Sequence, residues 1–168
     1  MAEPQEREYL VKIEKDPDTN RKLREQWWAN ETRPLLHRED GPAIQTWDKD
    51  TGVLVSEWHY FFGTRHRDDG PSRIERHPVT GETLSESWSY HDVLHRTDGG
   101  PALWRKDPET GVVTREEYWQ SGVEHREGGG PAVIYRDRAT GAVTYQGFYD
   151  EGDLIREEEP SPPEGLEP

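Results

Sequence analysis

The sequence predicts an all-β protein, an elongated single-layer antiparallel sheet built as a meander of about five stacked β-hairpin repeats, with no significant helix. His-Arg followed by Gly-Pro recurs four times, at intervals of 29, 29 and 30 residues. A Thr-Gly pair lies midway between successive copies. The segments between these markers are rich in Val, Thr, Trp and Tyr and lack a helical period. Because several markers recur in one fixed order, the internal repeat is a strong indication of a stacked architecture.

The recurring His-Arg-Gly-Pro element is expected to connect one hairpin to the next. Gly tolerates the extended backbone that Pro imposes on the residue before it. Later copies carry extra Gly residues, as a loop can. We predict a mainly structural element, with Arg and His bridging neighbouring loops by hydrogen bonds, and with an edge of a recognition surface as the functional alternative. The connector residues are His37, Arg38, Gly41, Pro42, His66, Arg67, Gly70, Pro71, His95, Arg96, Gly100, Pro101, His125, Arg126, Gly130 and Pro131.

Each unit is read as a strand, a Thr-Gly turn and a return strand. The opening unit lacks its own connector and has Asn20 in the place of the turn Gly. Asn imitates Gly well at positive φ, so the substitution fits a left-handed turn residue. A repeat domain at 9–155 is therefore expected after an N-terminal extension at 1–8. Its units are predicted at 9–34, 35–63, 64–92, 93–122 and 123–153.

The period fails after Asp153 in this reading. The segment that follows is rich in Pro and Glu and has little apolar surface to bury. A composition of that kind is typical of unfolded chains. The sequence therefore predicts a disordered acidic tail at 156–168.

The strand faces follow from alternation along each strand. A small residue after each Pro and an aromatic residue seven places after each turn Gly are predicted to face the core. His59 is the exception at the aromatic place, and Trp58 or Tyr60 could replace it through a local bulge. Alternation also puts four glutamates on the aromatic face, where the connector arginines are their candidate partners. These glutamates are Glu25, Glu57, Glu86 and Glu116.

The composition limits the classes of function. Only 30% of the residues are hydrophobic, but seven Trp, seven Tyr and three Phe can bury much area from few positions. The absence of Cys excludes disulfides and thiolate chemistry. A net charge of −14 favours a protein partner with a basic surface over nucleic acid or a membrane. The N-terminus shows no apolar signal segment, and a cytoplasmic protein is expected.

Repetition argues against catalysis and against a metal or other cofactor. Equivalent residues on successive hairpins should lie roughly 9–10 Å apart, at ~4.8 Å per strand. Ligands of one metal ion must converge within about 4 Å of each other, so equivalent histidines cannot share an ion. A catalytic triad needs three different residues that converge once, whereas repetition spreads the same residues along a ladder. The sequence therefore predicts no enzyme, no metal and no catalytic residue.

The elements "HREDGPA", "HRDDGPS", "HRTDGGPA" and "HREGGGPA", preceded by turns such as "FFGTRH" and "QSGVEH", resemble MORN-type hairpin repeats. They are most similar to the bacterial and phage variant repeats known as repeat antitoxins. The resemblance covers about 9–155. It implies an elongated single-layer sheet with a binding role, and it carries over no catalytic residue.

The functional reading is a non-enzymatic protein-binding module, such as an antitoxin, immunity protein or inhibitor, that masks a basic partner. The expected contact residues are the four repeated glutamates and an exposed aromatic stripe one step out of phase with the core. That stripe consists of Trp28, Tyr60, Trp119 and Tyr149. The alternatives are a nucleic-acid mimic that inhibits a DNA-binding protein, a carbohydrate- or cell-wall-binding module, and a scaffold whose open sheet edges pair into homodimers or longer arrays.

Overall fold

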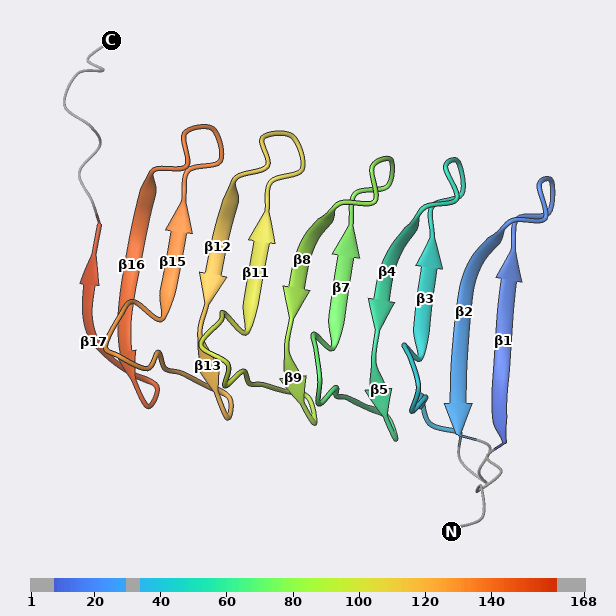
Figure 1. Cartoon of the computed structure of the whole chain (residues 1–168), viewed down its shortest axis with the longest axis horizontal. Coiled ribbons are helices and arrows are strands. Elements are labelled where there is room, and N and C mark those ends of the chain that lie inside the picture. Colours follow the sequence, from blue (N-terminus) through green and yellow to red (C-terminus); the bar gives the residue numbers. More distant parts are fainter. Residues whose placement is uncertain (1–7, 30–33, 160–168) are drawn as a thin grey trace.

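A computed structural model of the chain describes residues 8–29 and 34–159, and within them it confirms an all-β meander. Eleven strands form one antiparallel sheet in which neighbours in the sheet follow one another in the chain order, and the sheet extends along the long axis of the molecule (Figure 1). Its strands are β1 (Tyr9–Lys15), β2 (Lys22–Ala29), β3 (Ile44–Trp47), β4 (Leu54–Trp58), β7 (Arg73–Arg76), β8 (Thr83–Ser87), β11 (Leu103–Lys106), β12 (Val113–Glu117), β15 (Val133–Arg136), β16 (Val143–Asp150) and β17 (Asp153–Glu158).

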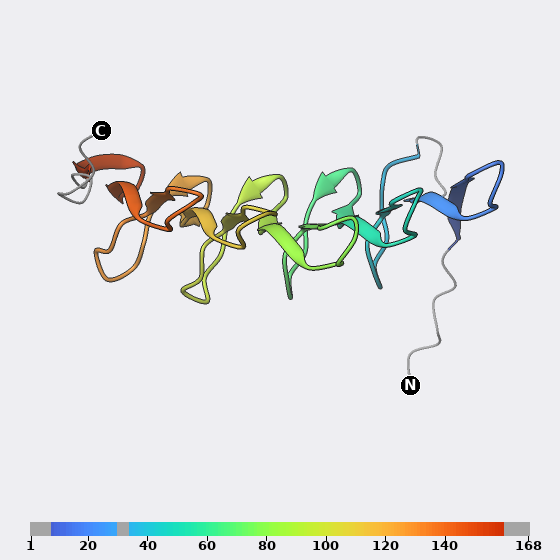
Figure 2. The same cartoon turned by 90° about the horizontal axis from the view of Figure 1, so that it is seen from above.

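Three small hairpins lie outside this sheet: their first strands continue the expected return strands, and their second strands lie where only connecting turns were expected. The hairpins lie at the same end of the long sheet, below β4, β8 and β12 in Figure 1, and Figure 2 shows the single row of strands from above. Each middle unit therefore holds a long hairpin in the sheet and a short one beside it. The short hairpins are β5 (Tyr60–Phe61) with β6 (Thr64–Arg65), β9 (Ser89–Tyr90) with β10 (Val93–Leu94), and β13 (Trp119–Gln120) with β14 (Val123–Glu124).

The turns of the short hairpins explain why they form. Both central residues have positive φ, as a two-residue type I′ turn requires. The N–H of Gly63 donates to the carbonyl of Leu36 at 2.8 Å, and the N–H of Asp92 donates to that of Arg65 at 2.8 Å. Each short-hairpin turn is therefore bonded to the residue just before the connector that precedes it in the chain. The three turn pairs are Phe62-Gly63, His91-Asp92 and Ser121-Gly122, and Glu151-Gly152 forms the equivalent turn between β16 and β17 of the long sheet.

The Thr-Gly turns close the long hairpins at the opposite end of the molecule, at the top of Figure 1. In one of them, Asp48 Oδ1 accepts hydrogen bonds from the backbone N–H of Asp50 at 3.0 Å and of Thr51 at 2.9 Å. It also accepts the Thr51 hydroxyl at 3.0 Å. The next residue, Gly52, has φ of 76°, and Asn20 adopts φ of 59° at the same place in the opening unit. The reading of Asn20 as a Gly substitute is confirmed.

The strand register places one continuous row of side chains across the long sheet. Each repeated glutamate of a return strand lies directly opposite an inward-facing residue of the first strand on either side. The predicted placement of these residues on one face is therefore confirmed. The row consists of Ile13, Glu25, Gln45, Glu57, Ile74, Glu86, Trp104, Glu116, Ile134 and Gln146.

The small residues after each connector Pro are fully buried, as predicted. Their backbones pair with the aromatic position of the preceding return strand: Trp27 N–H donates to the Ala43 carbonyl at 2.8 Å, and Tyr118 N–H donates to that of Ala132 at 2.7 Å. The core is consequently thin and close to the backbone. The buried small residues are Ala43, Ser72, Ala102 and Ala132.

The predicted disordered tail begins too early, because residues 156–158 belong to β17. This strand pairs with β16, and the Arg156 guanidinium carbon lies 3.9 Å from the centre of the Phe148 ring. Ile155 and Arg156 occupy the His-Arg places of a further connector, 30 residues after His125 and Arg126. The loss of His and Gly-Pro hid this copy. The rest of the expected tail (160–168) and residues 1–7 of the expected extension lie outside the described residues.

Candidate binding surface

Arginine side chains of the connectors lie flat on the aromatic residues that the sequence places on the same face. The distance from the guanidinium carbon to the ring centre is 4.1 Å for Arg38 on Trp27, 3.9 Å for Arg96 on Trp88 and 4.0 Å for Arg126 on Tyr118. Cation–π contacts of this kind stabilise most when they are partly desolvated. The repeated Arg therefore fastens each connector to the sheet.

His59 holds the aromatic place of the second unit itself. Its Nε2 lies 3.2 Å from Arg67 Nη1, where the other units have a stacked ring. Burial, followed by the nearby Arg67 charge, lowers the pKa of His59 to about 4. Trp58 and Tyr60, the candidate replacements, instead stack on each other with ring centres 6.4 Å apart. The imidazole is therefore neutral at pH 7, and no exchange of residues by a bulge is needed.

The same arginines also organise the loop between His-Arg and Gly-Pro. Arg96 Nε donates to Asp98 Oδ1 at 2.6 Å, and its Nη1 donates to the Pro101 carbonyl at 3.0 Å. A Cβ on Gly100 would lie 2.4 Å from the guanidinium carbon of Arg96. A side chain at position 100 would therefore displace the Arg96 guanidinium, so this Gly makes room for the stacked arginine and also tolerates the backbone restriction that Pro imposes.

The predicted link between the connector arginines and the repeated glutamates exists in the first unit, where Arg38 Nη1 is 3.8 Å from Glu25 Oε1. The prediction is wrong for Glu57 and Glu116, which form 2.5 Å ion pairs with arginines on the neighbouring first strands of the long sheet. Glu86 is bonded instead by the indole N–H of Trp104 at 3.0 Å. Stacking on the rings keeps the connector guanidinium groups away from these carboxylates. The arginine partners are Arg76 and Arg136.

The four glutamates are therefore used within the sheet. Glu25 is buried and is bonded by Lys22 and by the indole N–H of Trp27 at 2.6 Å. The side chain of Glu57 is only 16% exposed. A basic partner would have to displace an internal cation to reach them. They do not form the acidic contact row that the sequence predicts.

The predicted aromatic stripe is not exposed. Trp28, Tyr60, Trp119 and Tyr149 are each half-buried. The Trp119 indole N–H donates to Glu117 Oε2 at 3.1 Å. The Tyr60 ring stacks on Trp58 with ring centres 6.4 Å apart, and Tyr149 packs against the buried cluster of Tyr118, Ala132 and Ile134.

Glu117 is a buried carboxylate that the sequence analysis did not single out. Arg115 Nε donates to its Oε1 at 2.7 Å, and the Tyr135 hydroxyl lies 3.4 Å from the same oxygen. With Trp119 as a third donor, its charge is fully compensated. The Arg-Glu-Trp spacing of two residues, which puts all three on one strand face, was the available signal.

Connector histidines join each unit to the next short hairpin. The Phe62 N–H donates to His37 Nδ1 at 3.4 Å, and the Ser121 N–H donates to His95 Nδ1 at 3.0 Å. His37 stacks on the Phe62 ring with centres 4.0 Å apart, and His66 stacks on His91 at 4.4 Å. Bridging by His occurs as the sequence predicts, and in the second and third units it adds an aromatic ladder along the connector end.

The outer side of this ladder is accessible and acidic. Phe61, Phe62 and Tyr90 are 38%, 39% and 52% exposed. The side chains of Asp68 and Asp69 are 82% and 85% exposed beside them. A connector hydrogen bond from Arg67 lowers the pKa of Asp69, so this carboxylate remains charged well into the acid range. Exposed aromatic rings next to fixed negative charge are typical of a surface for a cationic ligand.

Clefts separate successive connectors and divide this surface into repeated compartments. The first has a volume of about 690 Å³ and is lined by Tyr60, Phe61 and His66 among others. The second has a volume of about 390 Å³ and reaches Arg96. The two clefts share one wall, which contains Arg67, Asp68, Asp69 and Tyr90.

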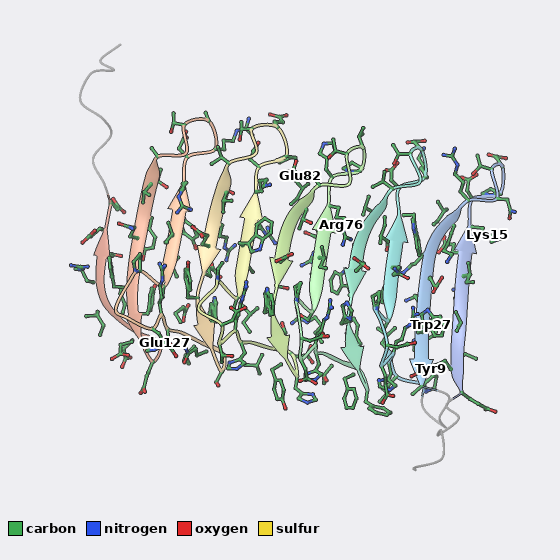
Figure 3. All side chains as sticks on the ribbon, in the orientation of Figure 1. Tyr9, Lys15, Trp27, Arg76, Glu82 and Glu127 are labelled. Atoms are coloured by element: carbon green, nitrogen blue, oxygen red, sulfur yellow. The ribbon has the colours of Figure 1, made fainter. Side chains whose placement is uncertain are left out.

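The connector end continues with a less aromatic character in the last two units. A cleft of about 170 Å³ lies between Arg96 and Arg126, and one of about 600 Å³ lies between Arg126 and Arg156. Ser121 and Glu151 take the turn places of Phe62 and His91 there. Figure 3 shows the connector end at the bottom, with Tyr9 and Glu127 labelled, and the turn end at the top, with Lys15 and Glu82 labelled.

Comparison of the chain with family models, with curated proteins and with solved structures gives no match. Among residues 8–29 and 34–159, no group of three or more His, Asp and Glu side chains is arranged to hold a metal ion. The same residues include no helix of the length and apolarity that crossing a bilayer requires. The site is therefore described by its geometry alone.

Proposed function

We propose that the chain is a non-enzymatic protein-binding repeat module that holds a partner with a basic surface on the connector end of the second and third units. The exposed strip consists of Phe61, Phe62, Tyr90, Asp68 and Asp69, and we call it the acidic–aromatic edge. The observation that carries the proposal is the adjacency of accessible rings and highly exposed carboxylates at the mouths of two clefts. Rings supply desolvated contact area, and carboxylates supply steering and register.

The charge balance of the edge supports a cationic partner. The connectors at 37–42 and 66–71 each carry two carboxylates and one guanidinium. The net charge of −14 for the whole chain acts in the same direction at longer range. Association should be fast at low salt and weaken as salt increases.

The class of protein that fits this proposal is a MORN-type repeat protein acting in the cytoplasm as an antitoxin, an immunity protein or an inhibitor. The nucleic-acid mimic is less well supported, because the repeated glutamates are paired within the sheet instead of forming an open double row. The carbohydrate module is less well supported, because the predicted aromatic stripe is half-buried.

Affinity capture from host cells with two charge-matched variants tests the proposal. The first variant, Asp68→Asn with Asp69→Asn, removes two charges from the acidic–aromatic edge. The second, Asp50→Asn with Glu109→Gln, removes two charges at the turn end, where the side chains are 75% and 76% exposed. A basic protein should be retained by the natural chain and by the turn-end variant, and lost from the edge variant. Equal recovery with both variants would show that the partner binds elsewhere.

Self-assembly through the open edges of the long sheet is a second candidate function, favoured by one observation. The outer strands expose aliphatic side chains next to unpaired backbone groups: Leu10 and Ile13 on β1 are 53% and 49% exposed, and Leu154 and Ile155 on β17 are 49% and 67% exposed. Exposed edge strands pair readily with another chain. If β1 pairs with a second copy, light scattering should show a dimer or a larger assembly for the natural chain and a monomer for Val11→Pro. A natural chain that is already monomeric at high concentration would rule this candidate out.

A further inference from the structure

We infer that the ligand of the acidic–aromatic edge is a segment of the partner in the polyproline II conformation, with Lys or Arg at every third residue. This inference rests on the proposed function and specifies the chemistry of its ligand. It follows from the spacing of the clefts, from the walls of each cleft and from the place along the molecule where both occur.

The spacing comes from the sheet. Successive connectors are separated by two strands of the meander, and neighbouring strands lie about 4.7–4.9 Å apart, which gives a repeat of about 9.4–9.8 Å. Polyproline II rises about 3.1 Å per residue with three residues per turn, so equivalent side chains recur every ~9.3 Å on one side. A ligand of this type places residues i and i+3 in neighbouring clefts without distortion.

Other regular ligand conformations do not match that repeat. Three residues of a β-strand span about 9.9 Å, but residues i and i+3 point to opposite faces. An α-helix needs about six residues at 1.5 Å each to advance by the same distance, and residues i and i+6 lie on different sides of the helix. A polyproline II segment combines the correct advance with the correct side-chain direction.

The cleft walls suit both parts of such a ligand. Tyr90 stands at the wall between the first and second clefts with half of its surface exposed, next to Asp68 and Asp69. A cation between this ring and these carboxylates gains a cation–π contact and an ion pair together. Phe61 lines the first cleft, and the exposed Phe62 ring lies 4.9 Å from it between ring centres. Both offer apolar surface to the ligand's intervening residues, as aromatic grooves do in the recognition of proline-rich segments.

The position of the site follows from the turn residues. Phe62 and His91 bring rings to the edge in the second and third units, whereas Ser121 and Glu151 stand in those places later. The third cleft is also the smallest, at about 170 Å³. The ligand segment therefore spans the first two clefts and presents two cationic side chains three residues apart.

Fluorescence anisotropy with labelled peptides tests the inference on the full chain. The probe is a proline peptide with two arginines three residues apart, and the matched control has the same composition with the arginines two residues apart. The three-residue spacing should bind about tenfold more tightly, which corresponds to ~1.4 kcal/mol. Asp68→Asn with Asp69→Asn should remove this preference, and Asp50→Asn with Glu109→Gln should keep it.

The outcomes separate the two proposals. If both peptides bind equally and both are weakened by the edge variant, the spacing inference is wrong and the binding edge stands. If neither peptide binds although the edge variant loses the captured partner, the ligand is not an extended basic segment, and the inference again fails alone. If peptide binding and partner capture both ignore the edge variant, both proposals are wrong.

Discussion

The two ends of the hairpins repeat with the same period and both carry acidic residues, but they use them differently. At the turn end, Asp48 accepts three hydrogen bonds from its own loop. At the connector end, Asp68 and Asp69 stand more than 80% exposed beside accessible rings. A repeated carboxylate can therefore close a turn in one place and remain available to a partner in another.

The contacts between units show the same difference. Turn loops are joined by isolated polar contacts, such as the hydrogen bond from the Thr51 hydroxyl to the Pro78 carbonyl at 2.5 Å and the exposed ion pair of Arg138 with Glu109 at 3.7 Å. Connectors are joined by stacked rings, by His Nδ1 bonds and by whole docked hairpins. More of the packing of this thin molecule is thus concentrated at the connector end, which gives its clefts fixed walls.

The largest effect on stability is expected for an arginine of the connector end. Arg96→Ala removes the stack on Trp88 and the bonds to Asp98 and to the Pro101 carbonyl. The free energy of unfolding should fall by about 2–3 kcal/mol in urea titrations. Arg138→Ala at the turn end, where the side chain is 68% exposed, should change it by less than about 0.5 kcal/mol. If both variants lost a similar amount of unfolding free energy, the connector end would not be more strongly stabilised than the turn end.

His59→Trp should sharpen the contrast by giving the second unit the stacked ring of its neighbours. The folded-state pKa of His59 is about 4, below the ordinary value of 6.5. The unfolded chain therefore takes up a proton first, and stability falls as pH drops from 6.5 towards 4. At pH 7 the free energy of unfolding of the variant should be about 1 kcal/mol higher than that of the natural chain, because the new ring makes a cation–π contact with Arg67. Between pH 6.5 and pH 4 the free energy of unfolding of the variant should also fall less than that of the natural chain, as measured by urea titrations at several pH values. An equal fall in both proteins would contradict the neutral imidazole.

Backbone conformation dominates at the turn end. Gly111 has φ of 73°, and a Cβ there would meet no atom within 4 Å. Gly111→Ala should therefore lower the free energy of unfolding by about 1 kcal/mol through the left-handed conformation alone. Gly111→Asn should lower the free energy of unfolding by less than half as much, because Asn tolerates the left-handed conformation, as Asn20 shows in the opening unit. Equal losses for Ala and Asn in thermal unfolding would point to a packing role instead.

The smallest effect is expected from titration of the turn carboxylates, which are solvent-exposed. Hydrogen bonds from the backbone N–H and hydroxyl of the turn Thr hold the pKa of Asp48 and Asp137 below its ordinary range. Their stabilisation is present above the unfolded pKa of about 3.9 and is lost as pH falls through the folded value. Asp48→Asn with Asp137→Asn keeps the acceptor oxygens and removes the titration. Circular dichroism should show a shallower loss of stability below pH 4 than for Asp50→Asn with Glu109→Gln; equal losses would contradict this origin.

Much of the long sheet could be predicted from the sequence, because its markers are local. Thr-Gly turns, the Asn20 substitution and the alternation that sets Glu57 against Ile74 all follow from backbone rules. The short hairpins were missed because Phe62 and His91 give no Gly or Asn signal at their first positive-φ positions. Arg156 was missed because its connector has lost both His and Gly-Pro.

The candidate site was less predictable because it depends on which partner each charge selects. Spacing alone allowed the connector arginines to pair with Glu57 or Glu116, whereas stacking on rings and bonds within the loop dominate. The exposure of Tyr90 and the burial of Glu117 depend on neighbouring units and on strand packing, which no single repeat reveals.

The central claim is that the connector end of the second and third units binds and the turn end does not. Hydrogen exchange of the full chain, with and without the proline–arginine peptide, tests it most directly. The account predicts slower exchange confined to 34–41, 59–69 and 89–98, with no change in the turn loops at 48–52, 77–81 and 107–111. Protection of the turn loops with an unchanged connector end would contradict it.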